Sequence, residues 1–138
     1  VTDKLSVFPV GDTKGFSRPA KDIEELVSFY QNSQVYLNTA NLSPISTALL
    51  EAASCGCAIV SVNKCMVPEI FTHGKDALLS NNPKELRKYC ELLLSDQELA
   101  TKLGSAARKT IEDKFGLDRF VNQWNGIFQR VANSVFKG

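Results

Sequence analysis

Residues 38–62, NTANLSPISTALLEAASCGCAIVSV, constrain the fold of this chain more than any other segment. They follow an apolar strand at 35–37 and contain a turn rich in Ser, Pro and Thr, a short apolar helix, a glycine stop at Gly56 and a second strand. A strand–turn–helix–strand unit of this size builds a parallel sheet. Strands and helices alternate along most of the chain, so we expect an α/β fold: a Rossmann-like parallel sheet flanked by helices, with a long helical C-terminal tail.

The turn before the helix has the chemistry of an anion site. We expect Ser43 to be the N-cap and Pro44 the first helical residue, with Ser46 and Thr47 placing two more hydroxyls beside free backbone N–H groups. Such a helix end binds phosphate, although capping and phosphate binding compete for the same N–H groups. Glu51 would then lie roughly 10 Å further along the axis, too far to share the phosphate but suitably placed for a sugar hydroxyl of the same nucleotide.

The remaining pattern predicts the other elements. Expected strands are 4–10, 34–39, 58–62 (apolar throughout, hence covered on both faces) and 77–79. Expected helices begin at a capping box of Asp22 and Glu25, at Pro44 (running to about Ser54 and buried), at Pro68, after Asn82, and at a second capping box of Ser95 and Glu98. We expect the helix after Ser95 to be interrupted or bent near Gly104 and to resume to Phe115, followed by a last helix with an apolar stripe over 120–135.

Bulk composition narrows the function classes. The 138 residues suit one domain, and a formal net charge of +1 with dispersed basic residues argues against a nucleic-acid partner. No apolar run reaches the length of a membrane span, and no signal peptide is visible. The chain begins with Val1 and its single methionine is Met66, so we expect a fragment whose missing part lies mainly upstream.

The four cysteines, Cys55, Cys57, Cys65 and Cys90, and the single histidine, His73, lack zinc-ligand spacing. We therefore expect small buried thiols in a reducing cytoplasm, with no metal and no cofactor. His73 is expected to cap a short helix.

The order of motifs over about residues 30–128 resembles the C-terminal domain of family 4, or group 1, glycosyltransferases of the GT-B fold. The resemblance is carried by Leu49-Leu50-Glu51-Ala52 with Cys55-Gly56, then Pro68-Glu69-Ile70, Gly74, Leu78-Leu79, Leu103-Gly104, Ala107-Arg108 and Phe115. It implies that residues 1–138 are one incomplete nucleotide-sugar-binding domain of a longer two-domain enzyme. That enzyme would transfer a sugar, with retention of configuration, to an acceptor held by a missing N-terminal domain.

The resemblance also assigns roles to residues. Glu51 would hydrogen-bond the donor ribose, while the backbone around Ile45, Ser46 and Thr47 would face the diphosphate and donor sugar. Less direct candidates around the donor cleft are Glu69, Phe8 and Val10. Lys14 and Arg18 are candidates, by charge only, for the cations that neutralise the diphosphate. The intact enzyme would be cytoplasmic or peripheral at the inner membrane surface, and the isolated fragment inactive.

One departure from the family pattern keeps alternatives open. The family's first Glu, an acid that approaches the donor sugar, falls at Ser43 here. The rival hypotheses are therefore a degenerate, non-catalytic GT-B-like or Rossmann-like module, and a nucleotide-sugar epimerase of GT-B shape.

Overall fold

A small parallel sheet organises the chain. The computed structural model describes residues 7–11 and 13–135. Strands β1 (Val35–Asn38), β2 (Ala58–Ser61) and β3 (Leu78–Leu79) form a three-stranded sheet in the order β1-β2-β3, and both pairs are parallel. Val35 pairs with Ala58, and Val60 pairs with Leu78. The expected α/β fold with a Rossmann-like parallel sheet is confirmed.

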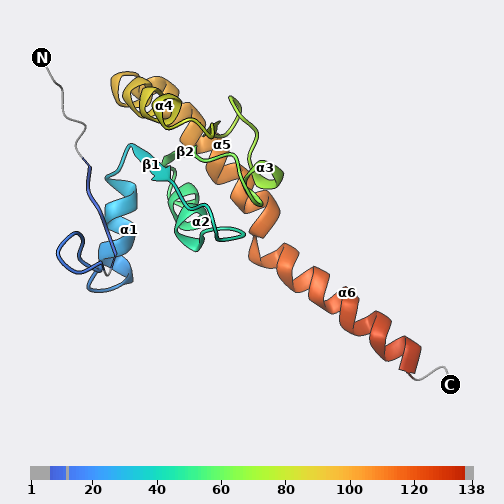
Figure 1. The fold of residues 1–138 in the computed structure, drawn as a ribbon. Coiled ribbons are helices and arrows are strands. Elements are labelled where there is room, and N and C mark those ends of the chain that lie inside the picture. Colours follow the sequence, from blue (N-terminus) through green and yellow to red (C-terminus); the bar gives the residue numbers. More distant parts are fainter. Residues whose placement is uncertain (1–6, 12, 136–138) are drawn as a thin grey trace, which may run out of the picture.

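Helices cover the sheet on both faces (Figure 1). They are α1 (Ile23–Gln31), α2 (Thr47–Ser54), α3 (Val67–Ile70), α4 (Pro83–Ser95), α5 (Gln97–Phe115) and α6 (Leu117–Val135). One core cluster joins α2, α3 and the C-terminal half of α5 to Ile59, and the other joins α4 and the N-terminal half of α5 to Ala58 and Val60. Because successive side chains of β2 point into the two clusters in turn, the strand is buried on both faces, as its apolar run predicts.

Several predicted boundaries are wrong. Residues 4–6 of the strand expected at 4–10 lie outside the described residues, residues 7–9 form no strand, and Val10 makes only a single bridge with Arg18. Helix α2 begins at Thr47, not Pro44, and is buried on one face only, through Leu49, Ala52 and Ala53. A loop occupies 39–46 instead, because the chain bends at Pro44 before the helix can start.

The expected features of α5 also change. Its N-cap is Asp96, whose carboxylate accepts the Leu99 N–H at 2.9 Å, and not Ser95. The helix is continuous through Gly104, where no bend occurs. Gly104 instead lets α5 approach the turn at Gly56, since a Cβ at this position would stand 2.1 Å from the Gly56 carbonyl oxygen.

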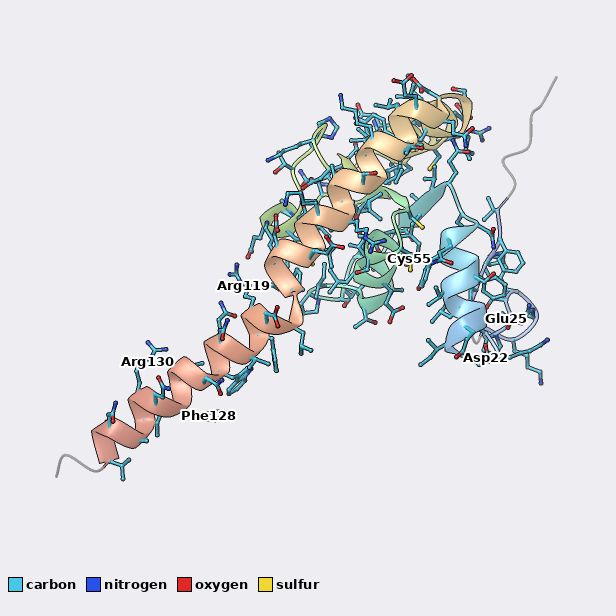
Figure 2. All side chains as sticks on the ribbon, turned by 180° about the vertical axis from the view of Figure 1, so that it is seen from behind. Asp22, Glu25, Cys55, Arg119, Phe128 and Arg130 are labelled. Carbon is cyan, nitrogen blue, oxygen red and sulfur yellow. The ribbon has the colours of Figure 1, made fainter. Side chains whose placement is uncertain are left out.

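The long helical tail is confirmed. Gly116 separates α5 from α6, and α6 extends away from the body of the chain, with Phe128 and Arg130 projecting from it (Figures 1 and 2). Its apolar stripe is exposed, from Leu117 through Phe120, Val121, Trp124, Ile127, Phe128 and Val131 to Val135. Within the described ranges, no helix has both the length and the apolar character needed to cross a membrane.

The cysteines are not uniformly buried. Cys57 and Cys90 are buried, but Cys55 is half-buried and Cys65 is exposed, so the expectation of four buried thiols is wrong for two of them. Cys65 also has φ +54°, in the left-handed region that non-glycine residues seldom adopt.

This difference predicts selective alkylation. Burial raises the pKa of the Cys57 thiol to about 11, and burial also raises the pKa of Cys90 and Cys55. With iodoacetamide at pH 8, we expect Cys65 to react first, Cys55 more slowly, and the other two only after unfolding, because the exposed thiolate is the nucleophile. Peptide mass spectrometry over time measures the order, with Cys65→Ser as the control. Early labelling of Cys57 would contradict the packing around β2.

Candidate functional site

Two buried polar side chains mark the carboxyl edge of the sheet. Asn38 ends β1 and Ser61 ends β2, and the Asn38 amide donates to the Ser61 Oγ at 2.9 Å. The Asn38 Oδ1 accepts the Ala40 N–H at 3.3 Å, which fixes the start of the loop at 39–46. Neither residue is predicted from the sequence as part of a site. Parallel strands end at the same edge of the sheet, so a polar residue at the end of each strand is the sequence pattern from which this pair could have been predicted.

The loop at 39–46 leads into the N-terminus of α2. Ser46, not Ser43, is the N-cap, with extended backbone at φ −81° and ψ 125°, and its hydroxyl makes no capping hydrogen bond. The Ser43 hydroxyl is exposed and donates to the Ile45 carbonyl at 2.9 Å. The first-turn N–H groups of α2 are therefore not occupied by the side chain of its N-cap, and the positive end of the helix dipole lies at the carboxyl edge of the sheet.

A second loop, at 63–66, lies against the first. The Met66 N–H donates to the Pro44 carbonyl at 3.0 Å, and the Cys65 Sγ lies 3.8 Å from the Asn41 carbonyl oxygen. This loop brings the exposed Lys64 to the same edge of the sheet. Lys64 is a cation that the sequence analysis missed, because no local pattern ties this loop to the loop before α2.

Glu51 lies one turn into α2. It is the fourth residue after Thr47, so its axial offset from the start of the helix is about 6 Å rather than the predicted 10 Å. The side chain is exposed, and its Oε2 accepts a hydrogen bond from the Tyr30 hydroxyl at 3.0 Å. The shorter offset brings the carboxylate and the helix N-terminus within reach of one nucleotide, since α-phosphate and ribose are neighbouring groups.

Of the less direct candidates, Phe8 and Val10 belong to the N-terminal segment, whereas Glu69 adjoins the second loop, because its N–H donates to the Met66 carbonyl at 3.1 Å. Phe8 packs against Phe29 of α1, with ring centroids 5.0 Å apart, and Val10 bridges Arg18 in the same N-terminal segment. Glu69 is exposed on α3, whose last carbonyls at Glu69 and Ile70 accept hydrogen bonds from the Lys114 Nζ at 2.9 and 2.6 Å. Lys114 thus ties α3 to the end of α5.

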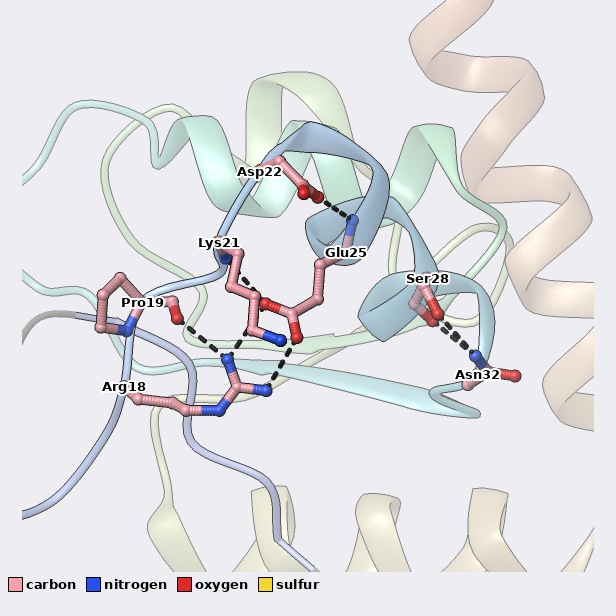
Figure 3. A network of polar contacts seen from close by, with 7 residues as sticks. All are labelled: Arg18, Pro19, Lys21, Asp22, Glu25, Ser28 and Asn32. Atoms are coloured by element: carbon pink, nitrogen blue, oxygen red, sulfur yellow. Dashed lines mark hydrogen bonds and ion pairs between the residues drawn. The ribbon is translucent and has the colours of Figure 1, made fainter.

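Of the two candidate cations, Arg18 is engaged in an ion pair. Its guanidinium forms two hydrogen bonds with the Glu25 carboxylate, at 2.9 and 3.0 Å (Figure 3). The guanidinium carbon also lies 5.2 Å from the centroid of the Phe29 ring. The Asp22 carboxylate accepts the Glu25 N–H at 2.8 Å, which confirms Asp22 as the N-cap. The return bond of the predicted capping box is shifted by one residue, because Glu25 accepts the N–H of Lys21, at 2.7 Å, and not that of Asp22. Lys14 lies in the exposed loop before this network.

This network predicts a pH dependence for the N-terminal segment. The Arg18 hydrogen bonds, and then the Lys21 N–H, lower the pKa of Glu25 from 4.5 to about 2. A lowered folded-state pKa stabilises the fold above the ordinary pKa, and that contribution is lost as the pH falls from about 4.5 towards 2. NMR titration of the Glu25 carboxyl measures this pKa, and the variant Arg18→Gln should return it towards 4.5. An unchanged titration in that variant would contradict the ion pair.

His73 is structural. Its Nδ1 accepts the Leu79 N–H at 2.9 Å and its ring packs near Tyr89, so it supports β3 and does not cap a helix. Across the described residues, no group of three or more His, Cys, Asp or Glu side chains is arranged to hold a metal.

A polar hollow of about 340 Å³ opens at the opposite, amino edge of the sheet. Its lining combines residues 31–34 and Gly56 with Gln97, Ala100, Thr101 and Ser105 of α5. The lining carries no charged side chain, so this hollow offers no cation to a phosphate group.

Comparison with known proteins agrees with this arrangement. A family model described as "Glycosyl transferases group 1" matches residues 18–110. An uncharacterized glycosyltransferase of Methanocaldococcus jannaschii is 26% identical over 115 residues, covering 81% of this chain and 29% of that protein. The spore coat protein SA of Bacillus subtilis is 28% identical over 119 residues, covering 83% of this chain and 30% of that protein.

A third relative, the N-acetyl-alpha-D-glucosaminyl L-malate synthase of Bacillus anthracis, is 26% identical over 108 residues, covering 77% of this chain and 28% of that protein. The chain thus spans less than a third of the length of these curated relatives. The family model covers well over half of the chain and includes the sheet, both loops of the site and Glu51. The chain therefore belongs to the group 1 glycosyltransferases.

Proposed function

We propose that this chain binds the nucleoside diphosphate part of a nucleotide-sugar donor. The observation that carries the proposal is the position of Glu51, one turn from the N-terminus of α2, at the carboxyl edge of a parallel sheet. In open parallel sheets ligands bind at this edge, and helix N-termini bind phosphate. An exposed carboxylate accepts two hydroxyl donors, which suits the two hydroxyls of ribose.

The chemistry that follows is transfer of the sugar with retention of configuration. The N–H groups around Ser46 and Thr47, with cations, would stabilise the negative charge that develops on the leaving diphosphate. Lys64 is the cation on the neighbouring loop, and Lys14 is a further candidate; no metal is required. Ser43, Ile45 and Glu69 would border the donor sugar, and Phe8 and Val10 the base.

The acceptor would be held by an N-terminal domain in a longer enzyme, which accords with the relatives being more than three times as long as the matched region. Such an enzyme would work in the cytoplasm or at the inner membrane surface. On this proposal residues 1–138 bind donor nucleotide weakly and catalyse no transfer by themselves.

Isothermal titration calorimetry with UDP, GDP and ADP tests the proposal. We expect one of the three to bind with a dissociation constant in the roughly 0.1–1 mM range, because only part of the site's cations is present. No heat of binding from any of them at millimolar concentration would refute it.

A degenerate, non-catalytic domain is the second candidate, and Ser43 favours it, because the family pattern that this sequence resembles has a Glu at this position. Such a domain still binds nucleotide but transfers no sugar. The variant Ser43→Glu in the longer enzyme separates the candidates: activity gained only in the variant indicates degeneracy, whereas an active parent excludes it. An epimerase of GT-B shape would convert the nucleotide-sugar into its epimer when incubated with nucleotide-sugar alone.

A further inference from the structure

The Glu51 carboxylate is exposed, yet one side chain from another element holds it. The Tyr30 hydroxyl, near the C-terminus of α1, donates to Glu51 Oε2 at 3.0 Å across 21 residues of sequence. An exposed Glu otherwise samples several rotamers, and a ligand that fixes one rotamer loses affinity through that entropy. A hydrogen bond that selects the rotamer beforehand removes part of this cost.

Tyr30 is itself held in place from three directions. Its ring packs edge-to-face against Tyr36 of β1, with centroids 6.1 Å apart, and against the core cluster below α2. Its backbone carbonyl accepts a hydrogen bond from the Cys57 thiol at 3.0 Å, just before β2. Burial, and then the bond to Glu51, raises the pKa of Tyr30, so the phenol stays protonated and remains a donor at neutral pH.

The bond leaves most of the acceptor positions of the carboxylate open. Over residues 7–11 and 13–135, no other hydrogen bond or ion pair involves the Glu51 side chain. Tyr30 therefore occupies one position on Oε2, while Oε1 and the second lone pair of Oε2 remain available to incoming hydroxyl groups.

We propose that Tyr30 is a positioning residue that orients the Glu51 carboxylate for the ribose of the donor nucleotide. This inference rests on the proposed function. The positioning role goes beyond the proposed function, because it makes nucleotide affinity depend on a residue of α1 that need not touch the ligand.

The test compares binding by wild-type chain and Tyr30→Phe, using whichever of UDP, GDP and ADP binds the wild type, together with its 2′-deoxy analogue. We expect Tyr30→Phe to weaken binding of the ribonucleotide about three- to tenfold. The preference of the wild type for the ribonucleotide over the deoxynucleotide should shrink by a similar factor, because the lost interaction acts on ribose. A general loosening of the fold would weaken both nucleotides equally.

Two controls isolate the effect. Tyr89→Phe makes the same change on α4 and should leave the affinity unchanged. In a double-mutant cycle, adding Tyr30→Phe to Glu51→Gln should change the affinity less than about twofold, since Tyr30 acts only through that carboxylate. Circular dichroism should show the same helix content for both Phe variants, because the ring is kept.

The outcomes separate the two levels of the proposal. If the wild type binds no nucleotide, the proposed function fails and this inference fails with it. If the wild type binds and Tyr30→Phe binds equally well, or loses affinity for ribo- and deoxynucleotide alike, the positioning role of Tyr30 is overturned while nucleotide binding stands.

Discussion

Gly104→Ala is expected to lower the free energy of unfolding by about 3 kcal/mol, the upper end of the range for overpacking a core. An alanine Cβ would stand 2.1 Å from the Gly56 carbonyl oxygen and 3.0 Å from the Gly56 carbonyl carbon. Both atoms are backbone, so no side chain can rotate away. Gly56 itself has φ +88° in the turn between α2 and β2, which limits how far that turn can move.

Moving α5 instead would not remove the cost. Helix α5 contributes Ala100 and Leu103 to the core cluster with α4, and Ala107 and Ile111 to the cluster with α2. A shift of the helix large enough to admit a methyl group would open both clusters. The destabilisation is therefore expected whichever element yields.

Thermal unfolding followed by circular dichroism measures the effect. For a domain of this size, about 3 kcal/mol corresponds to a fall in the melting midpoint of roughly 10 °C. Gly126→Ala is the matched control, because a Cβ there meets nothing within 4 Å on the exposed helix α6. Alanine is the better helix former by about 1 kcal/mol, so this variant should melt no lower than the wild type. Equal midpoints for the two variants would disprove the close packing of α5 on Gly56.

Gly104 also shows where sequence reasoning on the fold stops. A glycine within a helical sequence pattern lowers helix propensity, and a bend at Gly104 is predicted for that reason. The actual cause is a contact with residue 56, which no local pattern contains. By contrast, the apolar run at β2 predicts burial on both faces correctly, because its cause is local: every residue of the strand meets one of the two covering layers.

Helix starts are ambiguous for a related reason. Ser43 and Ser46 are both capping residues ahead of the apolar run at 48–50, and Ser95 and Asp96 are both capping residues ahead of Leu99. The sequence predicts the first residue of each pair as the N-cap. The structure uses the second of each pair. Capping preferences among Ser and Asp differ by only a few tenths of a kcal/mol, so the tertiary path of the preceding loop decides between neighbouring candidates.

The candidate site, like the fold, could be predicted from the sequence only where its residues are neighbours along the chain. The helix with its acid is visible in the sequence, because its residues are consecutive. Its supporting contacts join separate segments: Tyr30 with Glu51, Asn38 with Ser61, and the loop at 63–66 with the loop at 39–46. None follows from spacing along the chain.

Glu51→Gln is expected to weaken binding of nucleoside diphosphate about 10- to 100-fold, because a hydrogen bond to a charged acceptor contributes roughly 1.5–3 kcal/mol. Glutamine keeps the shape of the side chain but replaces one acceptor oxygen with a donor NH₂ group. Two ribose hydroxyls can then no longer both donate to it. Since Glu51 is exposed, the free energy of unfolding should change by less than about 0.5 kcal/mol.

The direction in which Glu51→Gln changes nucleotide affinity distinguishes a direct contact with the ligand from a long-range effect of the charge. Removing a negative charge about one helical turn from bound phosphates reduces repulsion, so without a specific contact Glu51→Gln would strengthen nucleotide binding. Glu98→Gln on α5 changes the net charge equally and supplies the control. Calorimetry on the three proteins at one ionic strength gives the comparison. A gain in affinity for Glu51→Gln, or a loss equal to that of Glu98→Gln, would show that Glu51 does not contact the ribose, even if the chain binds nucleotide.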